Sequence, residues 1–315
     1  MHPAWSLLAA LLFGPADPGA GFDHVRSAAL SAGDEETGAL TNGRHYYASN
    51  ERDLHLVAAD VRDRGGVLFG VAADPAYILA AWADADALIL VDLDPAIVDL
   101  HRIYAAFFRA ADDPASFREL WRADGRDAAQ ALLARVADDD SDAAALLATY
   151  AEAAPAIDRR FADLDARMAA HDTPWLLSDR ALYRRFAELV RRGQVLALRG
   201  DLTRDGVIRD LGDWLREADL EVNVLYLSNV EQYFMYHDPF RANIGALPLA
   251  DDSVVVRTLP GRPAGFEYIL QGGVDFQTRV ADPKVRSVYK LRGLSKGAHL
   301  EGRTRFEIAA PQAGR

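Results

Sequence analysis

The feature that most constrains the fold is a pair of short, uninterrupted apolar runs separated by a helical pattern. Val67–Val71 and Ala87–Asp92 each have the length of a strand, and a helix is expected between them over about Ala76–Ala83. Strands that are apolar on both faces are typical of a parallel sheet covered by helices on both sides. The sequence therefore predicts an α/β fold with a doubly wound, mostly parallel Rossmann-like sheet.

The strand pattern returns later in the chain. Val195–Arg199 and Val222–Ser228 are further candidates for buried strands, with a helix expected over about 204–217 between them. The stretch of about 110–190 is Ala-rich and helical in pattern, which predicts a helical insertion in the sheet domain. Three late strand candidates, separated by Gly/Pro turns, are Ser253–Leu259, Phe266–Leu270 and Ser287–Leu291.

The N-terminal region differs from the rest. Residues 1–45 are interpreted as an arm, a linker or a signal peptide, and residues 46–315 as the α/β domain. The apolar run Ala4–Phe13 has the length of a signal-peptide core, but no Lys or Arg precedes it and no clean A-x-A site follows. Downstream of this region, Ser49 is expected to cap a helix over about 50–64.

Composition excludes several function classes. The chain has no cysteine, which excludes disulfides, thiolate catalysis and Cys-ligated zinc. The formal net charge of −12, without a block of Lys and Arg, argues against a nucleic-acid partner. The eight histidines lack metal-binding spacing, and no apolar stretch approaches the roughly 20 residues of a membrane span. We expect a small-molecule substrate and no metal, nucleic-acid or membrane partner.

In such sheets, ligands bind at the carboxyl ends of the strands, so the residues that follow each strand are the candidates for a functional site. Gly70 and Ala72 follow the first strand, and their small size suits the close approach of a cofactor. Asp92 ends the second strand, 22 residues after Gly70, where an acid is placed to accept both ribose hydroxyls of an adenosine. Asp94, before a proline, is the better helix cap. Asp201, after the third strand, is either an acceptor for the adenine amino group or a turn acid.

Polar residues crowd the end of the fourth strand, in the string YLSNVEQY. Ser228 is placed beside the expected cofactor. Asn229, Glu231 and Tyr233 are the catalytic candidates, with Asn229 orienting a nucleophile and Glu231 acting as a general base. The alternatives are that Ser228 or Asn229 caps the next helix and that the aromatic residues belong to the core.

The string VDLDP, the later GD and the polar end of the fourth strand together resemble class I S-adenosylmethionine-dependent methyltransferases. More closely, over about residues 46–260, the chain resembles an uncharacterised bacterial family of methyltransferase-like proteins. The matching features are Ser49-Asn50-Glu51, the Gly66–Gly70 strand, Leu100-His101 with Tyr104 and Phe107-Phe108, YLSNVEQY at 226–233 and NIGALPL at 243–249. The first loop departs from the G-V-G of that family, reading Gly70-Val71-Ala72-Ala73-Asp74.

The resemblance implies a Rossmann-like methyltransferase fold and S-adenosylmethionine as cofactor. Because this cofactor is a cytoplasmic metabolite, we expect a cytoplasmic protein. The repeated SNE and SNVE strings suggest that Asn50 and Glu51 line one cleft with Asn229 and Glu231. Tyr46 and Tyr47 are expected to close the substrate side of this cleft from the N-terminal segment. The substrate itself stays open.

Four other functions compete with this one. Residues 293–297 match the G-x-S-x-G of a hydrolase, which requires a strand before Ser295 and a helix after it. A metal enzyme lacks its ligand spacing, and His101 is better explained as a packing residue. A nicotinamide dehydrogenase is disfavoured by the single glycine of the first loop. The non-enzyme alternative is a degenerate methyltransferase fold that binds a ligand or partner without chemistry.

Overall fold

A computed structural model describes residues 18–38, 40, 43–261, 265–294, 298–300 and 303–305. Its strands form one eight-stranded sheet in the order β3-β2-β1-β4-β5-β6-β8-β7. The first five strands in this order are mutually parallel, and β6 pairs antiparallel with β5. The strands are β1 Val67–Gly70, β2 Ala87–Asp92, β3 Val195–Arg199, β4 Val222–Ser228, β5 Leu249–Pro260, β6 Phe266–Gly272, β7 Ala298–Leu300 and β8 Arg303–Arg305.

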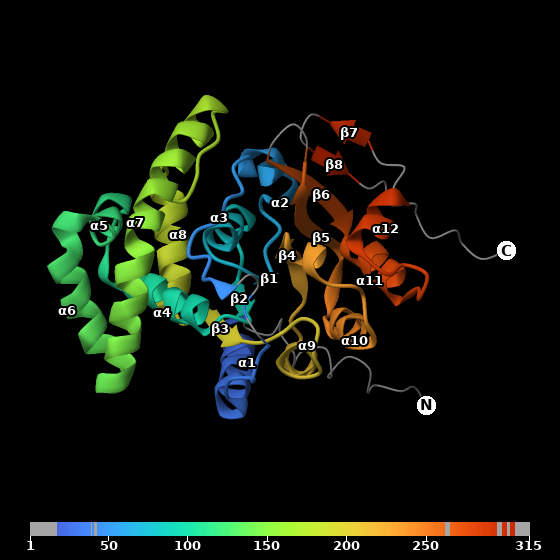
Figure 1. Cartoon of the computed structure of the whole chain (residues 1–315), viewed down its shortest axis with the longest axis horizontal. Helices are drawn as coiled ribbons and strands as arrows, with labels where there is room; N and C mark the ends of the chain where they lie inside the picture. Colours follow the sequence, from blue (N-terminus) through green and yellow to red (C-terminus); the bar gives the residue numbers. More distant parts are fainter. Residues whose placement is uncertain are drawn as a thin grey trace, which may run out of the picture.

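Helices cover both faces of this sheet (Figure 1). They are α1 Pro18–Ala32, η2 Leu54–Val57, α2 Ala58–Val61, α3 Asp74–Ala83, α4 Pro95–Ala110, α5 Pro114–Glu119, η3 Ala123–Gly125, α6 Arg126–Val136, α7 Asp140–Ala170, α8 Arg180–Arg191, α9 Val207–Glu217, η4 Val230–Tyr233, α10 Asp238–Ala246, α11 Gly273–Ala281 and α12 Val288–Gly293. The result is a mixed α/β fold with a mostly parallel sheet, compatible with a Rossmann-like fold.

Each face of the sheet has its own apolar core, because alternate residues of the strands point to opposite sides. Leu88 and Leu90 of β2 belong to the core shared with α3, α4, α7 and α8. Ile89 and Val91 belong to the core shared with α1, α9, α10 and α11. The uninterrupted apolar runs thus reflect a sheet buried on both sides, as expected.

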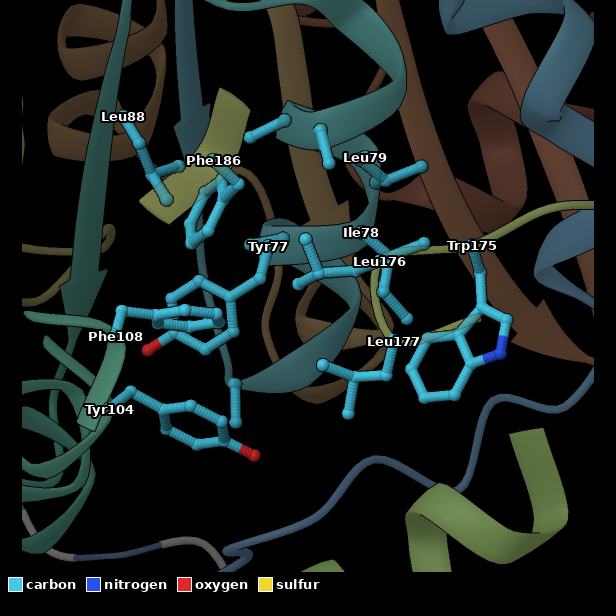
Figure 2. Packing of buried hydrophobic residues seen from close by; sticks show 14 of the residues in the cluster. Tyr77, Ile78, Leu79, Leu88, Tyr104, Phe108, Trp175, Leu176, Leu177 and Phe186 are labelled. Atoms are coloured by element: carbon cyan, nitrogen blue, oxygen red, sulfur yellow. The ribbon is translucent and has the colours of Figure 1, made fainter. Parts of the chain in front are cut away.

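The first core is rich in aromatic residues (Figure 2). All ten residues of α3 are buried, and Tyr77 on this helix packs its ring 4.7 Å from Tyr104 of α4 and 5.7 Å from Phe186 of α8. Helices α5 to α8 occupy the stretch expected to be a helical insertion. They lie to the left of the sheet in Figure 1 and share an apolar core with it that includes residues of α4 and α8.

Two local expectations are wrong, and a serine hydrogen bond explains each of them. Residues 288–293 form helix α12, not a strand, because Ser287 accepts a hydrogen bond from the backbone of Lys290 at 3.3 Å and starts a helix. Residues 50–53 are not helical. The side chain of Ser49 accepts the backbone N–H of Glu51 at 3.0 Å, and the helical turns begin only at Leu54.

The helix α12 also removes the strand that a G-x-S-x-G hydrolase requires before its serine; Ser295 itself lies outside the described residues. No helix of the described ranges has the length and apolarity to cross a membrane. The apolar run at residues 4–13 lies outside the described residues.

Candidate functional site

A cavity of about 340 Å³ opens at the carboxyl ends of the central strands. Strand β1 is flanked by β2 on one side and β4 on the other, so the strand order reverses at this point. Ligands of open α/β sheets bind in the crevice at such a point. The wall consists of the four loops that follow β1 to β4, at residues 71–73, 91–94, 200–203 and 228–230, together with part of the segment 40–50.

Asp92, the last residue of β2, lies half-buried on the cavity wall. Its carboxylate accepts the backbone N–H of Asp94 at 2.9 Å and also receives backbone hydrogen bonds from Ala72 and Leu93. Burial raises the pKa of Asp92 to about 6, and these backbone donors oppose the rise. The carboxylate that closes β2 therefore faces the same crevice as the bend that closes β1.

Asp94 has the separate role that its proline neighbour indicates. It caps α4 by accepting the backbone N–H of Ala96 at 2.9 Å, and it accepts a hydrogen bond from Nδ1 of His45 at 2.8 Å. His45 belongs to the segment that passes over the cavity, so Asp94 ties this segment to the sheet. Asp92 is left to face the cavity.

The two small residues after β1 differ in role. Ala72 lines the cavity in a left-handed conformation, at φ 62°. Gly70 does not line it: a Cβ there would lie 3.3 Å from Cβ of Ala76, so the glycine allows α3 to pack closely on β1. The expected contact between Gly70 and a cofactor is therefore replaced by a contact between helix and strand.

The N-terminus of α3 carries its own carboxylate. Asp74 is buried there, accepting the backbone N–H of Ser49 and a hydrogen bond from Nε of Arg160, both at 2.8 Å. Arg160 comes from α7 and is buried as well. Helix N-termini at this position of the fold bind phosphate groups in many proteins. Here the position is filled by a side chain.

Asp201 lies on the cavity wall, but both of its oxygens have partners within the chain. One oxygen accepts the backbone N–H and the hydroxyl of Thr203, at 2.8 and 2.7 Å, and the other lies 3.6 Å from Nε of Arg204. This is the geometry of a turn acid. Its carboxylate has further lone pairs for a ligand, and the predicted contact with an adenine amino group stays a prediction.

Ser228 ends β4 on the cavity wall, in the left-handed region at φ 47°. Its hydroxyl donates to Oε1 of Glu51 at 2.6 Å, and the hydroxyl of Thr258 donates to the same oxygen at 2.8 Å. Burial raises the pKa of Glu51, while hydroxyl donors, Ser228 foremost, oppose the rise. Glu51 thus lies behind the wall rather than on it, and it holds the unusual backbone of Ser228 in place.

Glu231 also lies behind the wall, which contradicts its assignment as a general base. Its side chain is buried in an ion pair with Arg257, at 3.3 Å, and accepts the hydroxyl of Tyr236. Arg257 is fully buried, with its guanidinium 4.3 Å from the ring of Phe276 and 2.7 Å from Oε1 of Gln271. Glu231 therefore anchors η4 to β5 and β6 and is closed to a substrate.

Of the two similar strings, the asparagines reach the cavity and the glutamates do not. Asn50 and Asn229 both line the cavity, and neither side chain forms a hydrogen bond with another described residue. Tyr233 lines it too, with 53% of its surface exposed. Of the two tyrosines expected to close the site, Tyr46 lines the cavity and Tyr47 does not, because its hydroxyl donates to Glu152 at 2.9 Å.

Comparison with protein families identifies one match. A model described as a domain of unknown function, DUF7790, matches residues 46–305. The chain belongs to the DUF7790 family. A comparison with curated proteins finds no match. The DUF7790 region contains every predicted site residue and all of the cavity wall except Leu40 and Arg44.

Part of the cavity wall was not predicted from the sequence. Leu93, Ile97 and Leu202 give the cavity apolar surface beside Asp92, and Arg44 gives it a cation. Each of the three apolar residues lies a few positions after the end of a predicted strand. That position in the sequence could have identified them as residues of the cavity wall. His101, by contrast, is buried against the hydroxyl of Tyr77, and burial lowers its pKa to about 3, so it is a neutral packing residue.

The arrangement suits recognition of a ligand that is part apolar and part hydroxylic. The described residues contain no group of His, Asp or Glu placed to hold a metal ion. A carboxylate between apolar surfaces can bind a sugar that carries a flat ring. The carboxylate accepts hydrogen bonds from the sugar hydroxyls, and the apolar surfaces contact the ring.

Proposed function

We propose that the chain is an S-adenosylmethionine-dependent methyltransferase with a class I methyltransferase-like fold, acting on a small molecule. The observation that carries the proposal is the position of Asp92. Its carboxylate faces the cavity at the point where strand order reverses, in contact with the backbone of Ala72. Acids at this position bind the ribose hydroxyls of adenosine-containing ligands.

The described residues fit such a cofactor. Asp92 would accept the ribose hydroxyls, and Leu93, Ile97 and Leu202 would contact the adenine ring. The cavity volume of about 340 Å³ falls within the roughly 300–1,000 Å³ range of small-molecule sites. When bound, the cofactor supplies an electrophilic methyl group on a sulfonium.

The carboxylate of Asp74 favours this ligand over a dinucleotide. A nicotinamide dehydrogenase binds pyrophosphate at the N-terminus of the helix after β1. In this chain that N-terminus holds Asp74, buried and paired with Arg160. This side chain occupies the position that a pyrophosphate would need, whereas S-adenosylmethionine has no phosphate.

The substrate side of the site is formed by uncharged groups. Asn50, Asn229 and Tyr233 line the cavity near the end of β4, where their amides and hydroxyl would orient a nucleophile. Much of the rate enhancement in such a reaction comes from holding the nucleophile in line, so these residues act by positioning. Arg44 and Tyr46 line the cavity from the N-terminal segment, where they would shield a bound cofactor from water.

The second candidate is a ligand-binding protein without catalysis. The burial of Glu231 in an ion pair favours it, because the acid expected as general base is removed from the cavity. The two candidates share a cofactor-binding site and differ only in methyl transfer.

Calorimetric titration with S-adenosylmethionine and S-adenosylhomocysteine tests the shared site. We expect both to bind, and we expect Asp92→Ala to weaken binding by about 100-fold, since hydrogen bonds to a charged group contribute roughly 1.5–3 kcal/mol each. Asp127→Ala, an exposed acid on α6, is the matched control. A folded protein that binds neither ligand, or binding that Asp92→Ala leaves unchanged, overturns the proposal.

Transfer of a labelled methyl group to a metabolite extract separates the two candidates. A methyltransferase yields a labelled small molecule, identified by mass spectrometry, and Asn229→Ala reduces the yield without changing cofactor affinity. Binding without any labelled product supports the ligand-binding protein.

A further inference from the structure

The lysines of this chain are confined to one short segment. The 315-residue chain, with a net charge of −12, has only three lysines: Lys284, Lys290 and Lys296. Arg286 lies among them. Because these basic residues are spaced by others, they form no continuous block, and the sequence analysis did not single them out. Lys296 lies outside the described residues.

The structure brings three of these cations to one exposed surface. Lys284 and Arg286 lie in the loop between α11 and α12, and Lys290 lies in the first turns of α12; all three are exposed. None of them forms an ion pair with a described residue, whereas the nearby Arg279 pairs with Asp275 at 2.7 Å. We call Lys284, Arg286 and Lys290 the basic patch.

The basic patch is linked to the segment that follows η4. The carbonyl of Arg286 accepts the backbone N–H of Tyr236 at 2.9 Å, three residues after Tyr233, which lines the cavity. Three exposed apolar side chains lie nearby: Tyr233 of η4, Met235 just after η4, and Tyr289 of α12, which is 54% exposed. Helix α12 packs against η4. Cations and exposed apolar side chains therefore lie together beside the candidate site.

From this surface we infer a docking site for an acidic segment of a partner protein. The complementary charge comes from the basic patch, and exposed Tyr and Met residues are enriched at protein interfaces. A polynucleotide fits less well. Nucleic-acid binding commonly rests on about six to ten phosphate contacts, and beyond three cations the strongly acidic chain would repel the phosphates. The inference does not depend on the cofactor proposed above.

Anisotropy of a fluorescein-labelled dodecapeptide of alternating glutamate and alanine tests the docking site on the full chain. The test variant is Lys284→Glu/Arg286→Glu/Lys290→Glu. The matched control is Arg135→Glu/Arg184→Glu/Arg192→Glu, which reverses three exposed cations far from the cavity and produces the same change in net charge. Circular dichroism checks that both variants are folded.

We expect wild-type binding that weakens with salt, roughly tenfold or greater loss of affinity in the test variant, and roughly twofold or less in the control. Absence of wild-type binding, or equal loss in both variants, overturns the inference. So does tighter binding of dodecauridylate through the same three residues, which assigns the surface to nucleic acid. A wild-type dimer that the test variant lacks, seen by light scattering, assigns it to a second copy of the chain.

Discussion

The carboxyl group of Asp92 combines two properties that rarely occur together on a structural side chain. It ends a buried strand with its pKa raised to about 6 by burial, and it faces an open cavity. Such a group is poorly stabilised in the free protein and gains partners when a hydroxylic ligand enters. This is a common property of residues that serve binding rather than folding.

A first prediction concerns pH. The ionised carboxylate of Asp92 accepts two ribose hydrogen bonds, and the protonated form loses part of this capacity. Because burial raises the pKa of Asp92 to about 6, affinity for S-adenosylhomocysteine should be constant above that pH and fall by up to roughly tenfold per pH unit below it. Calorimetry from pH 8 to pH 5 measures the profile. A flat profile contradicts the role of Asp92.

A second prediction concerns Glu51, whose pKa is raised above its ordinary value of 4.5 by burial. A raised folded-state pKa means that the proton stabilises the fold below pH 4.5 and that this contribution is lost as pH rises through the folded pKa. Glu51→Gln mimics the protonated form and keeps an acceptor for Ser228 and Thr258. It should therefore be more stable than wild type at pH 8, by a margin that shrinks toward pH 4.5.

Urea unfolding at several pH values measures this margin. Thr258→Val is the control, because it removes one donor to Glu51 without removing the carboxyl group. A stability difference between Glu51→Gln and wild type that does not change with pH would contradict the assignment of the buried charge to Glu51.

At the scale of elements, η4 depends on the ion pair between Glu231 and Arg257. Arg257→Met leaves a buried carboxylate without its cation, and we expect a loss of about 3–5 kcal/mol in the free energy of unfolding. Glu231→Leu/Arg257→Met should recover most of that loss, because no unpaired charge remains. Urea unfolding of the single and double variants checks both. Equal destabilisation of the two would mean that η4 does not rest on this pair.

The central strands and the main helices were predictable from sequence, whereas two segments near them were not. Apolar runs identify β1 to β4 because a doubly covered sheet leaves no polar face. The sequence predicts a strand where α12 forms, because its short apolar content does not distinguish a buried strand from one helical turn. The cap from Ser287 starts the helix, and Val288 and Leu291, three residues apart, share its buried face. The sequence predicts a helix over residues 50–53, because serine is a common helix cap. In the structure the hydroxyl of Ser49 accepts the backbone N–H of Glu51, and no helix begins there.

The candidate site was predictable to the same degree. Asp92, Ala72, Ser228 and Asn229 reach the cavity because their positions at strand ends determine where they lie. Whether a polar residue near a strand end faces the cavity or the interior depends on partners distant in sequence. Glu231 turns inward because Arg257 lies on the next strand, which no local pattern reveals.

At the scale of the whole molecule, helices α5 to α8 share one core with the sheet. Leu88 of β2, Phe108 of α4 and Phe161 of α7 belong to the same apolar cluster. We therefore predict that the chain unfolds in one transition, and that Phe108→Ala lowers its stability by about 3–5 kcal/mol without separating the parts. Tryptophan fluorescence, with Trp121 and Trp175 reporting on the helices, should share its midpoint with circular dichroism. Two separate midpoints would contradict a common core.

The complete burial of α3 has a consequence for synthesis in the cell. This helix has no face of its own for water, and part of its cover comes from far downstream: Phe186 packs on Tyr77, and the carbonyl of Pro174 accepts the indole N–H of Trp82 at 2.8 Å. A ribosome takes on the order of ten seconds to add the intervening residues. Throughout that interval the nascent chain presents one of its most apolar segments uncovered, and we expect it to need a chaperone there.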